Sequence, residues 1–175
     1  MENAVLVEGE GKLTTLEMEI ALAKFFNPRT NLIIPNVSWG MFNHECDLIV
    51  VGKSGLIREI EIKISKSDLL AEKKKRHEHK DKMISRLYFA IPEKLLPYIE
   101  YIPTHAGILS VSRFRKYYRT KIIRPAKTIG KYKLSDTDRL QLMRLSNLRI
   151  WGLKEKIIKL KKEQQILTSK LSRKL

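Results

Sequence analysis

Two carboxylates and an amine stand at a spacing that could support phosphodiester chemistry. Asp47 opens one apolar run, and Glu61-Ile62-Lys63 lies in the next apolar run along the chain. Two carboxylates a few ångströms apart repel each other unless one is protonated or a cation bridges them. Carboxylate oxygens are hard ligands that suit Mg²⁺ or Mn²⁺. A neighbouring lysine could orient a water molecule and neutralise the charge that develops on a phosphate.

Asp47 and Glu61 belong to runs with the composition of β-strands. These runs are residues 46–52 (CDLIVVG) and residues 56–64 (LIREIEIKI). The connection Lys53-Ser54-Gly55 between them is short and contains glycine, which is typical of a hairpin turn. In such a hairpin, Asp47 and Glu61 are expected to be cross-strand neighbours.

Charged side chains line one face of the second run. Because side chains alternate between the faces of a strand, Glu59, Glu61 and Lys63 share one face. The intervening isoleucines share the other face, which packs into a core. The same alternation is the usual pattern of a half-solvated antiparallel sheet, and an E-x-K tripeptide often occurs by chance. The metal-site interpretation therefore depends on the residues around the tripeptide.

A third carboxylate comes from an amphipathic stretch before the strands. Residues 14–26 (TTLEMEIALAKFF) repeat apolar positions at helical spacing. Thr14 or Thr15 is available as the N-cap, and Glu17 follows Thr14 at the spacing of a capping box. At about 100° of rotation per residue, Glu19 falls inside the apolar arc that faces the sheet. A carboxylate there needs a partner, unless it lies at the rim of the arc and reaches water.

This order of elements resembles the PD-(D/E)XK nuclease superfamily. A helix with Glu19, a strand, a strand with Asp47 and a strand with Glu61-x-Lys63 are followed by a further helix and strand. The resemblance implies an α/β fold, with a mixed central sheet flanked by helices in an αβββαβ core, and Mg²⁺ or Mn²⁺ as cofactor. It also implies that Asp47, Glu61 and the backbone carbonyl of Ile62 are metal ligands. Lys63 would be the catalytic lysine, and Glu19 an accessory carboxylate able to reach the metal.

Three longer stretches resemble the MmcB-like branch of this superfamily, which is associated with DNA repair and phages. They are EIKISKSDLLAEKKK, RLYFAIPEKL and IPTHAGILSV, and the resemblance covers about residues 14–111. Cys46 stands where the superfamily name has proline, at a position that varies and takes no part in the chemistry. Glu45 lies two residues before Asp47 and could be a further ligand or a salt-bridge partner.

The remaining apolar runs complete an α/β domain. Residues 86–91 (RLYFAI) and 106–111 (AGILSV) have the pattern of core strands, and the segment 93–100 between them contains a short helix. Strands joined by a helical crossover are parallel, so the sheet is predicted to be mixed. We expect a nuclease-like core over residues 1–130 and a basic helical extension over residues 131–175.

Positive charge is concentrated in the last third of the chain. The formal net charge is +16, from 35 Lys and Arg and 19 Asp and Glu. Residues 1–114 hold 16 basic and 15 acidic side chains, a net of +1, whereas residues 115–175 hold 19 and 4, a net of +15. Because cation contacts to phosphates supply most non-specific affinity, DNA is the expected partner. A membrane is less favoured, because the basic segment lacks a face of exposed aromatics and a cysteine for acylation.

Basic residues cluster soon after the predicted hairpin. Ser67 precedes an acidic first turn, which predicts a helix start with Ser67 as N-cap. The later half of DLLAEKKKRHEHK has almost no apolar residue and must be solvated. Its cations could contact phosphates beside a cleavage site, or they could belong to an ordinary solvated helix end; the candidates are Lys73, Lys75, His77 and Lys80. His77 and His79 alone are too few to indicate zinc.

A second basic segment mixes cations with aromatic rings. Residues 112–127 (SRFRKYYRTKIIRPAK) interleave Phe114, Tyr117 and Tyr118 with arginines and lysines. In single-strand binders, bases stack on such rings while cations follow the backbone. Here we expect the rings to pack beneath the sheet edge and the cations to contact phosphates. The candidate phosphate contacts are Arg113, Arg115, Lys116 and Arg119.

The last part of the chain is helical by pattern. Ser135 can cap a helix that begins at Asp136, and Gly152 is a candidate break. Apolar residues recur at alternating steps of three and four, interrupted only by Ser146 and Gln164, at Met143, Ile150, Leu153, Ile157, Leu160, Leu167 and Leu171. This heptad seam can fold back on the core, pair with a second copy, or lie along DNA. A homodimer would match the two-fold symmetry of a duplex.

Cysteine use and hydropathy bear on the compartment. Cys46, the sole cysteine, lies in an apolar run where a buried thiol is expected, which favours a reducing cytosol. The first residues have no signal-peptide pattern, and no apolar run is long enough to span a bilayer. We therefore expect a soluble cytoplasmic protein of a bacterium or a phage-infected cell.

The expected function is Mg²⁺-dependent hydrolysis of DNA phosphodiester bonds in repair, recombination, or phage and restriction DNA processing. Two alternatives remain open. One is a catalytically inactive DNA-binding accessory protein with the same fold, and the other is a structural helical assembly factor.

Overall fold

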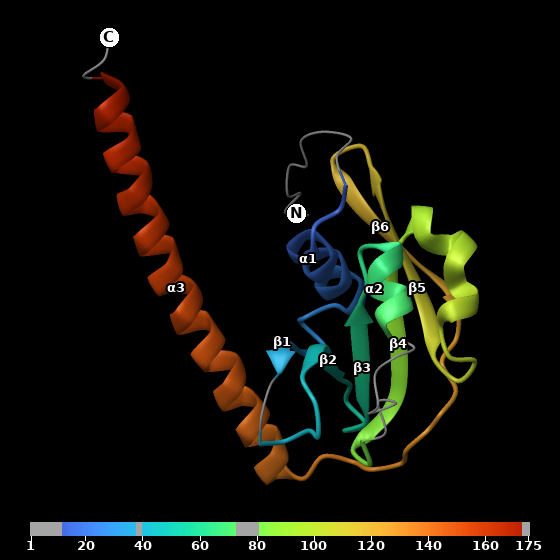
Figure 1. Cartoon of the computed structure of the whole chain (residues 1–175). Coiled ribbons are helices and arrows are strands. Elements are labelled where there is room, and N and C mark those ends of the chain that lie inside the picture. Colours follow the sequence, from blue (N-terminus) through green and yellow to red (C-terminus); the bar gives the residue numbers. More distant parts are fainter. Residues whose placement is uncertain (1–11, 38–39, 73–80, 173–175) are drawn as a thin grey trace. The chain divides into compact units, whose positions relative to one another are not determined.

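The computed structural model describes residues 12–37, 40–72 and 81–172 of the 175-residue chain. The chain divides into two compact units, with the boundary between Ser135 and Asp136. In chain order the elements are α1 (Thr15–Phe26), β1 (Leu32–Val37), β2 (Cys46–Val51), β3 (Ile57–Ile62), α2 (Lys66–Glu72), β4 (Ile84–Pro92), the 3₁₀ helix η1 (Glu93–Tyr101), β5 (Gly107–Phe114), β6 (Tyr117–Arg124) and α3 (Asp136–Ser172) (Figure 1).

The strands of the first unit form one six-stranded sheet in the order β1-β2-β3-β4-β5-β6 (Figure 1). Strands β1, β2 and β3 are successive antiparallel neighbours, and β6 is antiparallel to β5. Strand β4 is parallel to β3, and β5 is parallel to β4, because α2 and η1 provide the crossovers. The prediction of an α/β fold with a mixed sheet flanked by helices is therefore confirmed.

Each face of the sheet carries a helical layer. On one face, Met18 and Leu22 of α1 recur at helical spacing and belong to a core cluster with Ile60 of β3. On the other face, Leu69 of α2 packs with Phe89 of β4 in a second cluster that also includes η1. Because β3 lies inside the sheet with both faces covered, its side chains from residue 59 to residue 62 are all buried.

The local signals for helix starts succeed in one case and fail in another. The sequence offered Thr14 or Thr15 as the N-cap of α1. The structure shows that Thr14 is the cap and that it forms a full capping box with Glu17. Helix α2 begins before the predicted position, and its cap is Ser65 rather than Ser67. The Asp68 N–H donates to Ser65 Oγ at 3.2 Å, while the Ser67 hydroxyl lies 2.8 Å from the same oxygen.

Strand β6 is an element that the sequence pattern did not predict. The basic and aromatic segment forms a hairpin with β5, in which Phe114 pairs with Tyr117 and Arg115 turns with φ of 55°. Pairing of β5 with β4 ends at Val111, so the later residues of the hairpin lie beyond the edge of β4. Most of the β6 side chains are exposed.

Helix α3 is a single helix of 37 residues, and Gly152 does not break it. The apolar residues of the predicted seam from Met143 to Leu167 are exposed. Pairing of this seam with a second copy stays a prediction. No helix in the described ranges has a segment long and apolar enough to cross a bilayer.

Glu17 ties α1 to the β5–β6 hairpin. Its Oε2 accepts hydrogen bonds from the Thr14 N–H at 2.7 Å and the Thr14 hydroxyl at 2.9 Å. Its Oε1 accepts from Arg113 Nη2 at 2.5 Å and from the Tyr118 hydroxyl at 3.1 Å. The backbone N–H of Thr14 is the largest cause that lowers the pKa of Glu17 from 4.5 to about 2, and the Thr14, Arg113 and Tyr118 side chains lower it further against partial burial.

Replacing Glu17 with glutamine should reduce the free energy of unfolding by about 1–2 kcal/mol at neutral pH, because charge-assisted hydrogen bonds are lost while the cap is retained. The folded-state pKa is depressed, so this stabilisation is present above the ordinary value of 4.5 and is lost as pH falls through about 2. The free energy of unfolding, measured in urea for the wild type and for Glu17→Gln over that pH range, should become equal for the two proteins in acid. Glu100→Gln, at an exposed position, is the control.

Candidate active site

The predicted site residues gather where β2 begins and β3 ends. The antiparallel register pairs Leu48 with Ile60, and extending it by one position sets Asp47 opposite Glu61. Glu19 approaches from α1, which covers one face of these strands. The hairpin and the preceding helix therefore supply the three carboxylates from the elements that the sequence predicted.

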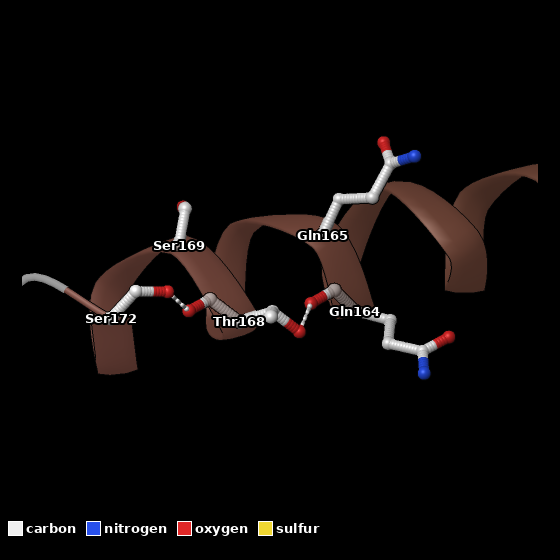
Figure 2. A pocket seen from close by; sticks show the side chains of 5 residues that line it. All are labelled: Gln164, Gln165, Thr168, Ser169 and Ser172. Carbon is white, nitrogen blue, oxygen red and sulfur yellow. Dashed lines mark hydrogen bonds between the residues drawn. The ribbon is translucent and has the colours of Figure 1, made fainter.

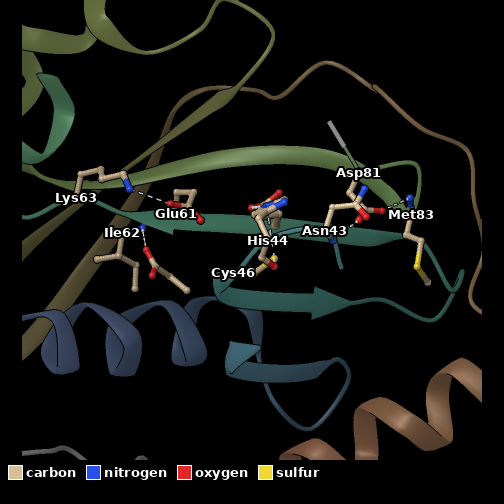
Figure 3. Close-up of polar contacts among 10 residues, drawn as sticks. Asn43, His44, Cys46, Glu61, Ile62, Lys63, Asp81 and Met83 are labelled. Carbon is tan, nitrogen blue, oxygen red and sulfur yellow. Dashed lines mark hydrogen bonds and ion pairs between the residues drawn. The ribbon is translucent and has the colours of Figure 1, made fainter. Parts of the chain in front are cut away.

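The charged face of β3 is buried. Glu59 is 0% exposed, Glu61 is 2% exposed and Lys63 is 7% exposed. The alternative of a half-solvated sheet is wrong, because the crossover layer covers this face of the sheet and Glu61 is in register with buried Phe89 of β4. Buried charges need partners, and Lys63 Nζ donates to Glu61 Oε2 at 2.8 Å (Figure 3).

Asp47 is bound to the backbone of the same tripeptide. Its Oδ2 accepts a hydrogen bond from the Ile62 N–H at 2.8 Å. The resemblance implied a role for the Ile62 carbonyl, whereas the observed contact uses the N–H of that residue. This bond fixes the Asp47 carboxylate beside the peptide that joins Glu61 to Ile62.

Glu19 is half-buried and close enough to Asp47 to sense its charge. Its Oε1 accepts a hydrogen bond from Asn36 Nδ2 at 3.3 Å, and Asn36 has a left-handed backbone with φ of 51°. Burial is the largest cause that raises the pKa of Glu19 above its ordinary value; the Asn36 bond opposes this rise, and the Asp47 carboxylate adds to it. Glu19 thus lies near Asp47, whereas α1 packs against the Ile60 face of β3 and Glu61 and Lys63 lie on the other face.

The three carboxylates do not meet at one point. Within the described part of the chain, the group of metal-ligating side chains whose atoms all lie within 4.8 Å of one another does not include Glu19, Asp47 or Glu61. Glu61 is held by Lys63, and Asp47 is held by Ile62. The oxygen donors fit Mg²⁺ chemically, but they would have to reorient to share one ion. Their roles as ligands remain predictions.

A second polar cluster adjoins the first, and the sequence interpretation missed it. His44 Nε2 lies 2.5 Å from Glu59 Oε1 and 3.7 Å from Cys46 Sγ. Burial is the largest cause that raises the pKa of the Cys46 thiol, and Glu59 and Glu61 raise it further. The i, i+2 spacing of His44 and Cys46 at the start of β2 was a usable signal for this cluster, whereas the zinc hypothesis from the sequence concerned only His77 and His79.

Asp81 holds the segment that carries His44. Its two carboxylate oxygens accept hydrogen bonds from the Asn43 N–H at 2.9 Å and the Met83 N–H at 2.8 Å. In Figure 3 the labelled residues form a row, from Lys63 and Glu61 through His44 and Cys46 to the Asp81 contacts. The segment just before β4 thereby positions a histidine that precedes β2.

The predicted DNA-contacting residues fall into three groups. Lys73, Lys75, His77 and Lys80 lie outside the described residues. Arg113 forms the ion pair with Glu17. Arg115, Lys116 and Arg119 are exposed on the β5–β6 hairpin.

The rings of this hairpin differ from the prediction. Phe114 is 54% exposed and Tyr117 is 48% exposed, so they do not pack beneath the sheet edge. The physical reason is that the hairpin extends beyond the last residue of β5 that pairs with β4. The guanidinium groups of Arg115 and Arg119 lie 5.5 Å and 5.6 Å from the centre of the Phe114 ring. Tyr118 is half-buried by its contact with Glu17.

A separate open depression lies on the last turns of α3 (Figure 2). Its hydroxyl groups bind carbonyls of their own helix: Thr168 Oγ1 donates to Gln164 at 2.9 Å, and Ser172 Oγ donates to Thr168 at 2.7 Å. It brings together no acid, base or nucleophile pair that would support catalysis.

Comparison with known proteins supports the fold. No protein-family model and no curated protein matches the sequence. A solved structure, the SPO1766 protein of unknown function from Silicibacter pomeroyi, is similar with a TM-score of 0.55 and 19% sequence identity. The similarity covers 78% of this chain and 86% of that chain. At this identity the likeness concerns the fold alone.

Replacing Lys63 with methionine should lower the free energy of unfolding by about 3–5 kcal/mol, because Glu61 remains buried without its ammonium partner. The double variant Glu61→Gln/Lys63→Met should be less destabilised than Lys63→Met, since it removes both charges. Urea unfolding measures the free energy of unfolding of the wild type, Lys63→Met and the double variant. Lys94→Met, at an exposed position, is the control. A cost below about 1 kcal/mol for Lys63→Met would show that the pair behaves as a solvated one.

Proposed function

We propose that this chain is a metal-dependent nuclease of the PD-(D/E)XK type that hydrolyses DNA phosphodiester bonds. The observation that carries the proposal is the buried Glu61–Lys63 pair on β3, at 2.8 Å, with Asp47 bonded to the intervening peptide. Glu19, on the first helix of an α1-β1-β2-β3-α2-β4 order, adds a carboxylate that senses Asp47. A carboxylate with a raised pKa, such as Glu19, in the neighbourhood of a buried lysine is typical of catalytic sites.

Asp47, Glu61 and Glu19 supply the hard oxygen donors that would hold Mg²⁺ or Mn²⁺. When bound, such an ion neutralises phosphate charge and increases the acidity of water. Hydrolysis joins the water oxygen to phosphorus, breaks one phosphorus–oxygen ester bond and delivers a proton to the leaving oxygen. Lys63 would orient the water and stabilise charge on the phosphate, and its contact with Glu61 keeps the ammonium positioned for that role.

A DNA-binding accessory protein with the same fold is the second candidate. It is favoured by the existing contacts of the carboxylates, since Glu61 is bonded to Lys63 and Asp47 to Ile62. In this reading the charged residues stabilise the sheet, and the exposed basic hairpin provides the function. Metal-dependent turnover separates the two candidates.

Incubation of the full-length protein with plasmid and with single-stranded DNA should give cleavage in Mg²⁺ or Mn²⁺ and none in EDTA. Asp47→Asn and Glu19→Gln should each lower the rate, and we expect a loss of about a hundredfold for Asp47→Asn, as for other groups that stabilise a transition state. Glu100→Gln alters an exposed acid outside the candidate site and should leave the rate unchanged.

Circular dichroism must first show that each variant is folded. Equal cleavage by the wild type and Asp47→Asn, or cleavage that persists in EDTA, would contradict the catalytic assignment. DNA binding by the wild type without any metal-dependent cleavage would instead support the accessory protein.

The β5–β6 hairpin is the surface that we propose for DNA contact. Arg115, Lys116 and Arg119 present three exposed cations, and the exposed rings of Phe114 and Tyr117 are suited to stacking on unpaired bases. In the register, Phe114 pairs with Tyr117, so the two rings lie side by side on one face. Because cations and exposed rings lie on the same hairpin, we expect it to bind DNA that offers unpaired bases, such as a single strand or a duplex end.

The triple variant Arg115→Ala/Lys116→Ala/Arg119→Ala should weaken DNA binding and reduce the salt dependence. Three lost phosphate contacts should lower the slope of log affinity against log salt by about 2.7 for duplex DNA. Fluorescence anisotropy at several salt concentrations measures this slope. A control triple variant of the exposed residues Lys53, Lys82 and Lys94 matches the charge change, and an equal effect in both triples would refute the hairpin as the site.

A further inference from the structure

We propose that His44, Cys46 and Glu59 form a binding site for a transition-metal ion of the Zn²⁺ type. His44 Nε2, Cys46 Sγ and a Glu59 carboxylate oxygen all lie within 4.8 Å of one another. The three side chains come from the segment before β2, from β2 itself and from β3. This site is distinct from the Mg²⁺ ligands proposed above, and it does not depend on nuclease activity.

The distances fit a tetrahedral ion after a small movement. Bond lengths of about 2.0–2.3 Å from Zn²⁺ to nitrogen, oxygen and sulfur place the tetrahedral ligand pairs of this set about 3.3–3.6 Å apart. His44 Nε2 and Cys46 Sγ are already 3.7 Å apart. His44 Nε2 and Glu59 Oε1 are 2.5 Å apart and would have to separate by about 1 Å to admit the ion.

The donor atoms determine the class of metal. One imidazole nitrogen, one sulfur and one carboxylate oxygen form a borderline-soft set that suits Zn²⁺ or Co²⁺, whereas Mg²⁺ prefers oxygen ligands alone. Three protein ligands leave a fourth tetrahedral position for water, as in open zinc sites. The chain would then bind Zn²⁺ or Co²⁺ at His44, Cys46 and Glu59, and Mg²⁺ at the site with oxygen ligands alone.

Carboxylates around the cluster would offset the positive charge of a bound metal ion. Cys46 and Glu59 are fully buried; burial is the largest cause that raises the pKa of the Cys46 thiol, and the carboxylates of Glu59, Glu61 and Asp81 raise it further. An ion that binds the sulfur displaces the thiol proton to solvent and brings positive charge among these carboxylates. Asp81 also fixes the backbone at Asn43, which holds the His44 segment in place before any ion arrives.

Cobalt is the probe, because its thiolate complexes show a charge-transfer absorption in the near ultraviolet. The chain has one cysteine, so such a band in the full-length protein reports Cys46 alone, whatever His77 and His79 bind. Titration of the reduced, chelator-treated protein with Co²⁺ should produce the band at one equivalent, and added Zn²⁺ should abolish it. Absence of the band from the wild type would mean that the cluster is a buried ion pair only, and would overturn the proposal.

Variants locate the ion. Cys46→Ser should abolish the band, and Glu59→Gln should weaken Co²⁺ binding by at least the roughly tenfold that loss of an outer partner typically costs. Glu100→Gln and His105→Asn are matched controls outside the cluster and should bind Co²⁺ as the wild type does. Asp47→Asn should keep the band even where cleavage is lost. Loss of the band in Asp47→Asn would place the ion at the other carboxylates and overturn the assignment.

Discussion

The structure depends on the burial of charged side chains in a strand that is covered on both faces. Glu59, Glu61 and Lys63 lie on one side of β3, under the layer of α2 and η1. A buried charge is costly unless a partner compensates it, so each carboxylate constrains its neighbours. Glu61 requires the Lys63 ammonium, and Glu59 brings in His44 from the segment before β2. Asp81 then holds that segment by its backbone.

Most of the first unit could be predicted because its signals are local. The capping box at Thr14, the glycine-containing connection between β2 and β3, and the crossover before β5 each follow from a few adjacent residues. Strand β6 has no such signal, because its partly buried face carries Tyr118, Thr120 and Arg124 and so shows no apolar alternation. At α2, two serines compete for the same cap, and spacing alone does not distinguish them.

The candidate site was predictable only in part, because only some of its contacts join residues that are near each other in sequence. The alternation of a strand places Glu61 and Lys63 on one face whatever the tertiary structure, and their contact follows from it. The contacts of His44 depend on Asp81, which is distant in sequence and fixes the intervening backbone. Asp47 has both a backbone donor and neighbouring carboxylates within reach, and its choice of the Ile62 N–H is a matter of side-chain orientation that spacing does not encode.

The Lys63 ammonium lies beside Glu61, at one end of the buried carboxylates Glu59 and Glu61. Its charge would oppose the binding of a metal ion at that end. Two residues along one face of a strand are separated by about 6.6 Å, so Glu59 and Glu61 are near enough to share the field of a nearby charge. A divalent ion at Glu61 would compete with the Lys63 ammonium, whereas one at Glu59 would share the carboxylate with the His44 imidazole, whose nitrogen is itself a metal ligand. The His44 end would therefore admit a metal at lower electrostatic cost than the Lys63 end. Occupation of either end would disfavour a second ion at the other, because two divalent charges would then face each other in a buried layer.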